Sequence, residues 1–172
     1  MTRNIEIKAR IASVEAMAAQ VTALADHGPS DIAPDDTFFV CERGRVKLRV
    51  VSPTEGQLIF YQRANQAGPK ASFFVLAPTA APDALREALS LAYGQAGRVR
   101  KHRTLYRVGR TRVHLDRVEH LGDFLELEVE LAEGERGEQG MEEAYNLMAS
   151  LGIATTQLIE GAYVDLLAQQ RT

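Results

Sequence analysis

Strict alternation between ionic and apolar side chains runs through much of this chain and constrains its fold more than any other feature. In residues 124–131, Glu126, Glu128 and Glu130 share one face, while leucine and valine fill the other. Such alternation is typical of a β-strand with one polar and one apolar face. We expect further strands over residues 4–11, 45–51, 57–63 and 111–116, over the β-prone apolar run 71–77 and over the less regular segment 99–106.

Four other segments repeat apolar side chains at helical spacing. They predict helices over residues 14–27, from Pro82 to about residue 94 or 97, over roughly 139–151 and over roughly 157–169. Loops are expected over residues 29–36, 52–56, 64–70 and 132–138, from their Pro, Gly, Asn and Asp content. The chain has 172 residues and neither a long linker nor an internal repeat, so we expect one domain over residues 1–172.

The polar faces of the expected strands are almost purely ionic. For any single strand, an antiparallel sheet with its polar face in water would explain the pattern. The predicted helices, however, are amphipathic and could cover the apolar faces from outside. Together these features predict an α+β fold in which a closed or nearly closed antiparallel β-barrel has an ionic interior and flanking α-helices.

A barrel of this kind would enclose many charges of both signs. Its basic side chains would be Lys8, Arg10, Lys47, Arg49, Arg63, Lys101 and Arg103, together with Arg45 and Arg112. Its acidic side chains would be Glu6, Asp116, Glu126, Glu128 and Glu130, the last lying near a strand end. Buried charges need partners. A triphosphate with a divalent cation fits both sets, because Arg and Lys bind phosphate oxygens and carboxylates bind Mg²⁺ or Mn²⁺.

The composition excludes several other classes of protein. With 20 basic and 23 acidic residues the net charge is −3, which argues against a duplex-DNA binder, and we expect no nucleic-acid partner. Cys41 is the single cysteine, so an internal disulfide framework is excluded. No apolar run is long enough to span a membrane, and no signal peptide precedes the first strand, so we expect a cytoplasmic protein without a membrane partner. No glycine-rich phosphate-binding loop is present, so side chains must bind the phosphates.

Six motifs, in order along nearly the whole chain, resemble those of the CYTH, or triphosphate tunnel, family. Residues 4–8 resemble E-x-E-x-K, 44–49 G-R-L-K-L-R, 58–63 L-I-x-Y-x-R, 99–103 V-x-K-x-R, 113–116 with 121–128 the pair I-H-L-D and L-G-x-F-x-E-x-E, and 162–167 the terminal S-Y-x-D-L-L. Asn4 stands in place of the first glutamate, and Ala162 in place of the serine. Residues 36–39 and 147–153 add a resemblance to the class IV adenylyl cyclase branch.

The resemblance implies an eight-stranded antiparallel tunnel that binds a triphosphate and Mg²⁺ or Mn²⁺. Carried over by position, the metal candidates are Glu6, Asp116, Glu126 and Glu128, and with Lys8 they form the expected catalytic set. The triphosphate-binding candidates are Lys8, Lys47, Arg49, Arg63, Lys101 and Arg103, to which the strand face adds Arg10. Asp116 could instead orient a nearby Lys or Arg. The loss of a carboxylate at Asn4 would weaken one of two metal positions.

The leading functional hypothesis is a metal-dependent enzyme that converts a nucleoside triphosphate, with ATP giving cyclic AMP and pyrophosphate. One alternative is a hydrolase of inorganic or organic triphosphate, such as thiamine triphosphate. Another is a non-catalytic module that binds a nucleotide or polyphosphate, for which Asn4 is the main argument. The expected partner is therefore a small molecule containing a triphosphate, and a homodimer is kept open.

Overall fold

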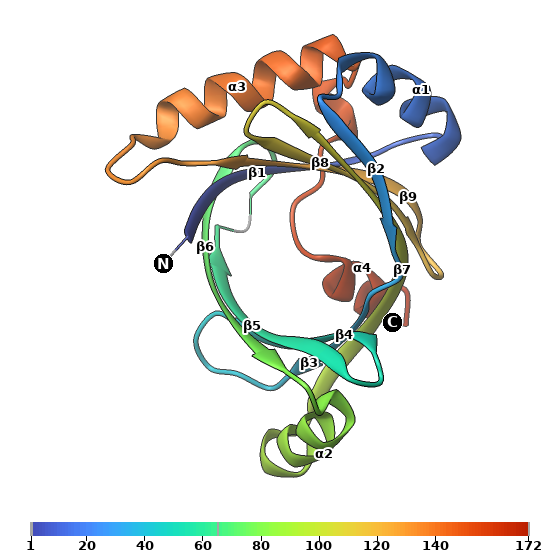
Figure 1. Cartoon of the computed structure of the whole chain (residues 1–172), viewed down its shortest axis with the longest axis vertical. Helices are drawn as coiled ribbons and strands as arrows, with labels where there is room; N and C mark the ends of the chain where they lie inside the picture. The colour runs from blue at the N-terminus through green and yellow to red at the C-terminus, as the bar shows by residue number, and fades with distance from the viewer. Residues whose placement is uncertain (1, 65, 172) are drawn as a thin grey trace.

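The computed structural model describes residues 2–64 and 66–171, and at its centre is a closed antiparallel barrel (Figure 1). Eight strands close it in the order β7–β3–β4–β5–β6–β1–β9–β8 and back to β7. Their bounds are Thr2–Arg10 (β1), Asp35–Phe39 (β3), Arg45–Ser52 (β4), Glu55–Arg63 (β5), Lys70–Thr79 (β6), Gln95–Val108 (β7), Thr111–Val118 (β8) and Gly122–Glu130 (β9). The predicted eight-stranded barrel is confirmed, and its closure leaves no unpaired sheet edge around the ring.

One further strand, β2 (His27–Ile32), pairs with the same edge of β7 as β3 does, but farther along that long strand. β3 pairs with the first half of β7, and β2 pairs with residues 103–107 of the same long strand. The sequence predicted a loop over 29–36, and this was wrong for most of that segment. The proline, serine and aspartates that suggested a loop are accommodated because β2 is largely exposed, where backbone pairing does not require apolar side chains.

Four helices accompany the barrel, as predicted. Three of them lie outside its wall, and the last, over residues 163–169, lies at one end of the barrel and is seen through the ring of strands (Figure 1). The four helices are α1 (Val14–Leu24), α2 (Pro82–Tyr93), α3 (Gly137–Ser150) and α4 (Tyr163–Gln169). Helix α1 begins where the Ser13 side chain accepts a hydrogen bond from the amide of Ala16, and α2 begins with Pro82 in its first turn. Helices α1 and α3 lie over one side of the barrel, and α2 lies on the opposite side, against β3 and β4.

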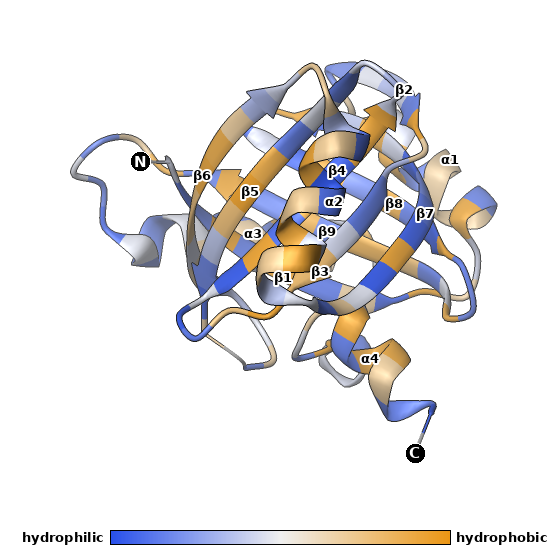
Figure 2. Cartoon of the chain, turned by 90° about the horizontal axis from the view of Figure 1, so that it is seen from below, coloured by the Kyte–Doolittle hydropathy of each residue, from blue (hydrophilic) through white to orange (hydrophobic). Residues whose placement is uncertain are grey.

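The main hydrophobic core lies between the barrel wall and these helices, not inside the barrel. Ile7, Leu115 and Leu127 point outward from β1, β8 and β9 and pack with Val21 of α1 and Met148 of α3. Alternating hydrophilic and hydrophobic bands along β5 and β7 follow from this arrangement (Figure 2). Since successive side chains of a strand point to opposite faces, burial of the apolar face under the helices directs the ionic face into the barrel.

The fourth predicted helix begins later than expected. Residues 155–157 form a short 3₁₀ turn, and the chain then runs extended until α4 starts at Tyr163. In this extended segment Leu158 forms a β-bridge with Ala9, and the amide of Ile159 donates to the carbonyl of Lys8, at 2.9 Å. Backbone pairing with β1 therefore overrides the helical spacing. Across the described residues, no helix combines the length and apolar character that crossing a membrane would need.

Candidate active site

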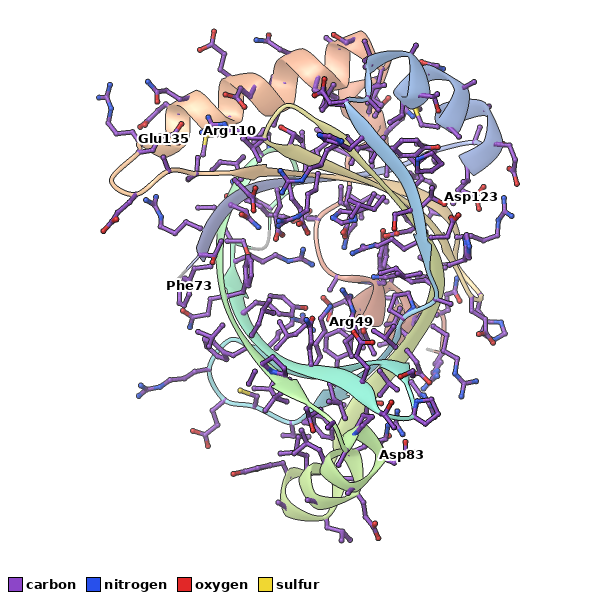
Figure 3. All side chains as sticks on the ribbon, viewed as in Figure 1. Arg49, Phe73, Asp83, Arg110, Asp123 and Glu135 are labelled. Carbon is purple, nitrogen blue, oxygen red and sulfur yellow. The ribbon has the colours of Figure 1, made fainter. Side chains whose placement is uncertain are left out.

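The barrel encloses a cavity of about 430 Å³, within the range of small-molecule binding sites. Among the described residues, seven basic and five acidic side chains line it. The basic ones are Lys8, Lys47, Arg49, Arg63, Lys101, Arg103 and Arg112. The acidic ones are Glu6, Asp36, Glu126, Glu128 and Glu130. In Figure 3 the Arg49 side chain lies within the ring of strands, whereas Phe73, Asp83 and Arg110 lie outside it. The cavity thus collects bases and carboxylates with a net excess of bases.

On the β3–β4 side, Asp36 holds two of the predicted phosphate-binding bases. Its carboxylate accepts from Lys47 Nζ at 3.0 Å and from Arg49 Nε and Nη2 at 2.8 Å each. Burial alone would raise the pKa of Asp36, but Lys47 and Arg49 outweigh it and hold this pKa well below its usual range. Burial also lowers the pKa of Lys47 to about 8, despite the attraction of Asp36. Asp36 therefore fixes the positions of both bases.

Between β7 and β8, Arg103 forms a second fixed group. Its guanidinium makes two 2.7 Å hydrogen bonds to Asp116 and a 2.8 Å bond to Glu126. The Tyr163 hydroxyl donates to Asp116 at 2.7 Å. Asp116 has no exposed surface and lies behind the lining of the cavity, with both oxygens engaged. Its position matches the alternative in which Asp116 orients a neighbouring base.

Lys101 is the base best placed to accept a ligand. Its ammonium lies 4.9 Å from the centre of the Tyr163 ring, and its side chain lines the cavity. Within residues 2–64 and 66–171, the ammonium of Lys101 has no hydrogen-bond or ion-pair partner. Burial and the neighbouring Arg103 lower its pKa well below the usual value, although Asp116 and Asp36 oppose this. An anion in the cavity would supply the missing partner.

The carboxylates form the wall built by β1 and β9. Glu6 accepts from Arg63 at 3.0 Å, and Glu126 lies 3.2 Å from the ammonium of Lys8. Burial, followed by repulsion from Glu128, raises the pKa of Glu6, against the attraction of Arg63. Carboxylate oxygens are hard ligands, and here they come from the paired strands β1 and β9. A nearby cation would stabilise the charged form of Glu6. Both features fit Mg²⁺ or Mn²⁺.

The described residues do not present three His, Cys, Asp or Glu side chains grouped to hold a metal ion by themselves. A divalent cation would therefore share one or two carboxylates and complete its coordination with water or phosphate oxygens, which is usual for Mg²⁺.

His114 also faces this wall. Its Nε2 lies 3.3 Å from Glu128 Oε2, but the geometry is not that of a hydrogen bond, and neither ring nitrogen has a hydrogen-bond partner among the described residues. The ring is buried and lines the cavity.

The extended segment before α4 packs against the basic and acidic walls of the cavity. The carbonyl of Gly161 accepts from Lys8 Nζ at 3.2 Å and from Arg63 Nη2 at 3.4 Å. The ammonium of Lys8 also lies 4.0 Å from the centre of the Tyr163 ring. Gly161 and Tyr163 thus help to position Lys8 and Arg63, which lie far from them in the sequence.

Two bases expected inside the barrel lie elsewhere. Arg10, at the end of β1, is exposed; its guanidinium lies 4.7 Å from the centre of the Phe124 ring and donates to the Leu121 carbonyl at 3.2 Å. Arg45, at the start of β4, forms an ion pair of 2.6 Å with Asp165. Both residues share the correct strand face, but they lie at strand ends.

Sequence reasoning missed Asp36, Tyr163 and Lys70 as site residues. Lys70 is fully buried, its ammonium donates to the Gln66 carbonyl at 2.8 Å, and it pairs in register with Glu6. The available signal was that Lys70 is the one lysine of four outside the recognised motifs. Its position at the end of a predicted loop concealed it.

Eight antiparallel strands around an ionic tunnel define a class of β-barrels with a charged interior. A family model describing the CYTH domain matches residues 2–163, so this chain belongs to the CYTH family. None of the curated proteins matches it.

Several solved structures share the fold. PH1012 of Pyrococcus horikoshii OT3 is 20% identical, with a TM-score of 0.83 over 95% of this chain and 98% of its own. A candidate adenylate cyclase from Vibrio parahaemolyticus is 16% identical, with a TM-score of 0.75 over 96% and 97%. HpAC1 from Hippeastrum, a candidate adenylyl cyclase with a dominant triphosphatase activity, is 14% identical, with a TM-score of 0.70 over 100% and 97%. At these identities, the likeness shows the fold alone.

Proposed function

We propose that this protein is a metal-dependent enzyme that acts on a triphosphate inside the barrel. The observation that carries the proposal is the buried ammonium of Lys101, which faces a base-rich cavity without an anionic partner among the described residues. Lys47, Arg49, Arg63 and Arg103 line the same cavity and are held by carboxylates. Bases that are fixed in advance neutralise a phosphate chain without having to reorganise during the reaction.

The roles of the chain's own residues follow from their positions. The bases orient the three phosphates and stabilise the charge that develops on the leaving group. Glu6 and Glu126, next to Glu128 on the same wall, would hold Mg²⁺ or Mn²⁺, which when bound polarises the phosphorus–oxygen bond that breaks. Asp36 and Asp116 do not contact the substrate in this proposal; they keep Lys47, Arg49 and Arg103 in place.

We infer a nucleoside triphosphate as substrate, from the resemblance to class IV adenylyl cyclases. The 3′ oxygen of ATP attacks the α-phosphorus, its proton is lost and pyrophosphate leaves, giving cyclic AMP. Hydrolysis is the second candidate, because the HpAC1 neighbour has a dominant triphosphatase activity. Water then attacks the terminal phosphorus and releases phosphate. The two reactions differ in which phosphorus lies beside the carboxylate wall.

Product analysis tests the proposal. The protein is incubated with ATP, inorganic triphosphate or thiamine triphosphate, with Mg²⁺ or Mn²⁺, and products are separated by chromatography. Cyclic AMP with pyrophosphate supports the cyclase, and free phosphate supports the hydrolase. Binding of triphosphate without turnover would overturn the enzymatic proposal and leave a binding module.

A carboxylate variant connects turnover to the site. Glu126→Gln should lower metal-dependent turnover by about a hundredfold or more while the fold survives. Glu143→Gln, at an exposed carboxylate of α3, is the matched control and should keep the wild-type rate. Equal rates for wild type and Glu126→Gln would contradict the assigned role of Glu126.

A further inference from the structure

One end of the carboxylate wall is already occupied by a guanidinium. In the strand register Asn4 lies opposite Glu130, and Arg112 lies opposite Glu128. Arg112 donates to Glu128 Oε2 from Nε at 3.0 Å and from Nη2 at 2.8 Å, and to Glu130 Oε1 from Nη1 at 2.8 Å. The other oxygen of Glu130 accepts from Arg107 at 2.9 Å.

Asn4 completes the surroundings of Arg112. In the amide orientation that satisfies both ends, its nitrogen donates to the Arg3 carbonyl at 3.0 Å and its oxygen accepts from Arg112 Nη2 at 3.2 Å. Asn4 is only 1% exposed, so its amide oxygen cannot turn to bulk water. Two carboxylates and an amide oxygen thus surround one positive group.

Carboxylate and amide oxygens are also the ligands that hard divalent cations prefer. A guanidinium and a metal ion cannot occupy the same space, and each would repel the other at this separation. Glu6 and Glu126, on the opposite side of Glu128, have different partners. Glu6 accepts from Arg63, and Glu126 accepts from Arg103 and lies 3.2 Å from the ammonium of Lys8. Among the described contacts, none of these three bases joins two glutamates of the wall. Arg112, by contrast, bridges Glu128 and Glu130 and also donates to the amide oxygen of Asn4, so its guanidinium fills the space between them.

We propose that Arg112 is a fixed cation of the tunnel, which fills the place between Asn4, Glu128 and Glu130 and limits the protein to one divalent cation, on the side of Glu6 and Glu126. The inference of a metal ion at Glu6 and Glu126 rests on the proposed function. The exclusion of an ion at Glu128 and Glu130 rests on the contacts of Arg112 alone. Arg112 is therefore a positioning residue that sets the number of metal ions.

Counting bound Mn²⁺ tests the proposal without any turnover. The full chain is titrated with Mn²⁺, without a phosphate ligand, and free Mn²⁺ is measured by electron paramagnetic resonance. Wild type should bind one ion per chain. Arg112→Met, which keeps an unbranched flexible side chain but removes the guanidinium with its charge and donors, should bind two. Arg112→Lys, which keeps the charge, should remain at one.

Two additional measurements locate the new ion and keep the test decisive. Adding Glu130→Gln to Arg112→Met should return the count to one, and circular dichroism checks that each variant is folded. Two ions in wild type, or one in folded Arg112→Met, would overturn the proposal. If Arg112→Met does not fold, the wild-type count and folded Arg112→Gln, expected to bind two, decide it. No ion in wild type but one in Arg112→Met would support the role of Arg112 and contradict the metal site of the proposed function.

Discussion

Arg103 and Asp116 face each other from paired positions of β7 and β8 and share two hydrogen bonds of 2.7 Å in the buried wall of the barrel. Removal of Asp116 leaves the buried guanidinium of Arg103 with Glu126 as its one carboxylate partner among the described residues, and breaking a buried pair of this kind costs up to about 3–5 kcal/mol. Asp116→Asn should therefore lower the free energy of unfolding by about that amount in urea denaturation.

The same variant tests the proposed positioning role of Asp116. Where it remains folded, isothermal titration calorimetry should show at least tenfold weaker binding of inorganic triphosphate, because Arg103 loses its orientation. Asp83→Asn, which removes an exposed helical ion pair with Arg86, is the control and should change neither property. Unchanged affinity in folded Asp116→Asn would contradict the positioning role.

Two adjacent aspartates of β3 offer an internally matched comparison. Asp36 is 1% exposed and holds Lys47 and Arg49 inside the barrel, whereas Asp35 points outward to Arg98 and Arg100. Asp36→Asn should destabilise the protein by about 3 kcal/mol or more, because it leaves two buried bases without their negative partner. Asp35→Asn should cost less than about 1 kcal/mol, because its pairs are partly exposed. Similar losses in thermal or urea denaturation would show that the Asp36 group does not behave as a buried charge cluster.

The lowered pKa of Lys47 predicts how binding depends on pH. In the free protein this pKa is about 8, so the ammonium is lost above pH 8, while bound triphosphate favours the charged form. Affinity for inorganic triphosphate should therefore fall as pH rises, by about fivefold between pH 8 and 9 for this one group. Lys47→Arg, which stays charged, should weaken this dependence. An identical pH profile for both proteins in calorimetric titrations would contradict the prediction.

Stability should change in the opposite direction over the same range. Between pH 8 and the ordinary lysine pKa of 10.5, the unfolded chain binds more protons at Lys47 than the folded chain does. The contribution of Lys47 to the free energy of unfolding therefore rises with pH across this window. Urea denaturation of wild type and Lys47→Arg at pH 7.5 and 9.5 measures it, and the rise should be smaller in the variant. A rise as large in the variant would assign the effect to other groups.

Helix α3 approaches the barrel closely at Gly140. A Cβ atom there would lie 2.7 Å from side-chain atoms of both Ile5 and Leu131. Overpacking of this kind costs about 1–3 kcal/mol, more than the roughly 1 kcal/mol by which alanine favours a helix over glycine. Gly140→Ala should therefore lower the melting temperature. Gly137→Ala, where the nearest such atom is 3.6 Å away, should leave it almost unchanged. Equal effects would mean that α3 does not pack as described.

Much of this architecture could be predicted from alternation alone, since a strand face is a local property. Six predicted bases line the cavity because each lies on the inward face of its strand, at a depth where that face meets the cavity: Lys8, Lys47, Arg49, Arg63, Lys101 and Arg103. Alternation does not report depth along a strand, so Arg10 and Arg45 could not be separated from them. Asp36 was concealed because its neighbours on β3 do not alternate, and the later start of α4 depends on pairing with β1, which no local pattern reveals.

A crystal soaked with Mn²⁺ and a non-hydrolysable ATP analogue tests the central claim most directly. We predict three phosphates inside the barrel against Lys47, Arg49, Arg63, Lys101 and Arg103, with one anomalous Mn²⁺ peak beside Glu6 and Glu126. Density for the analogue outside the barrel, with the tunnel free of phosphate at saturating concentration, would contradict the claim that this tunnel is a triphosphate site.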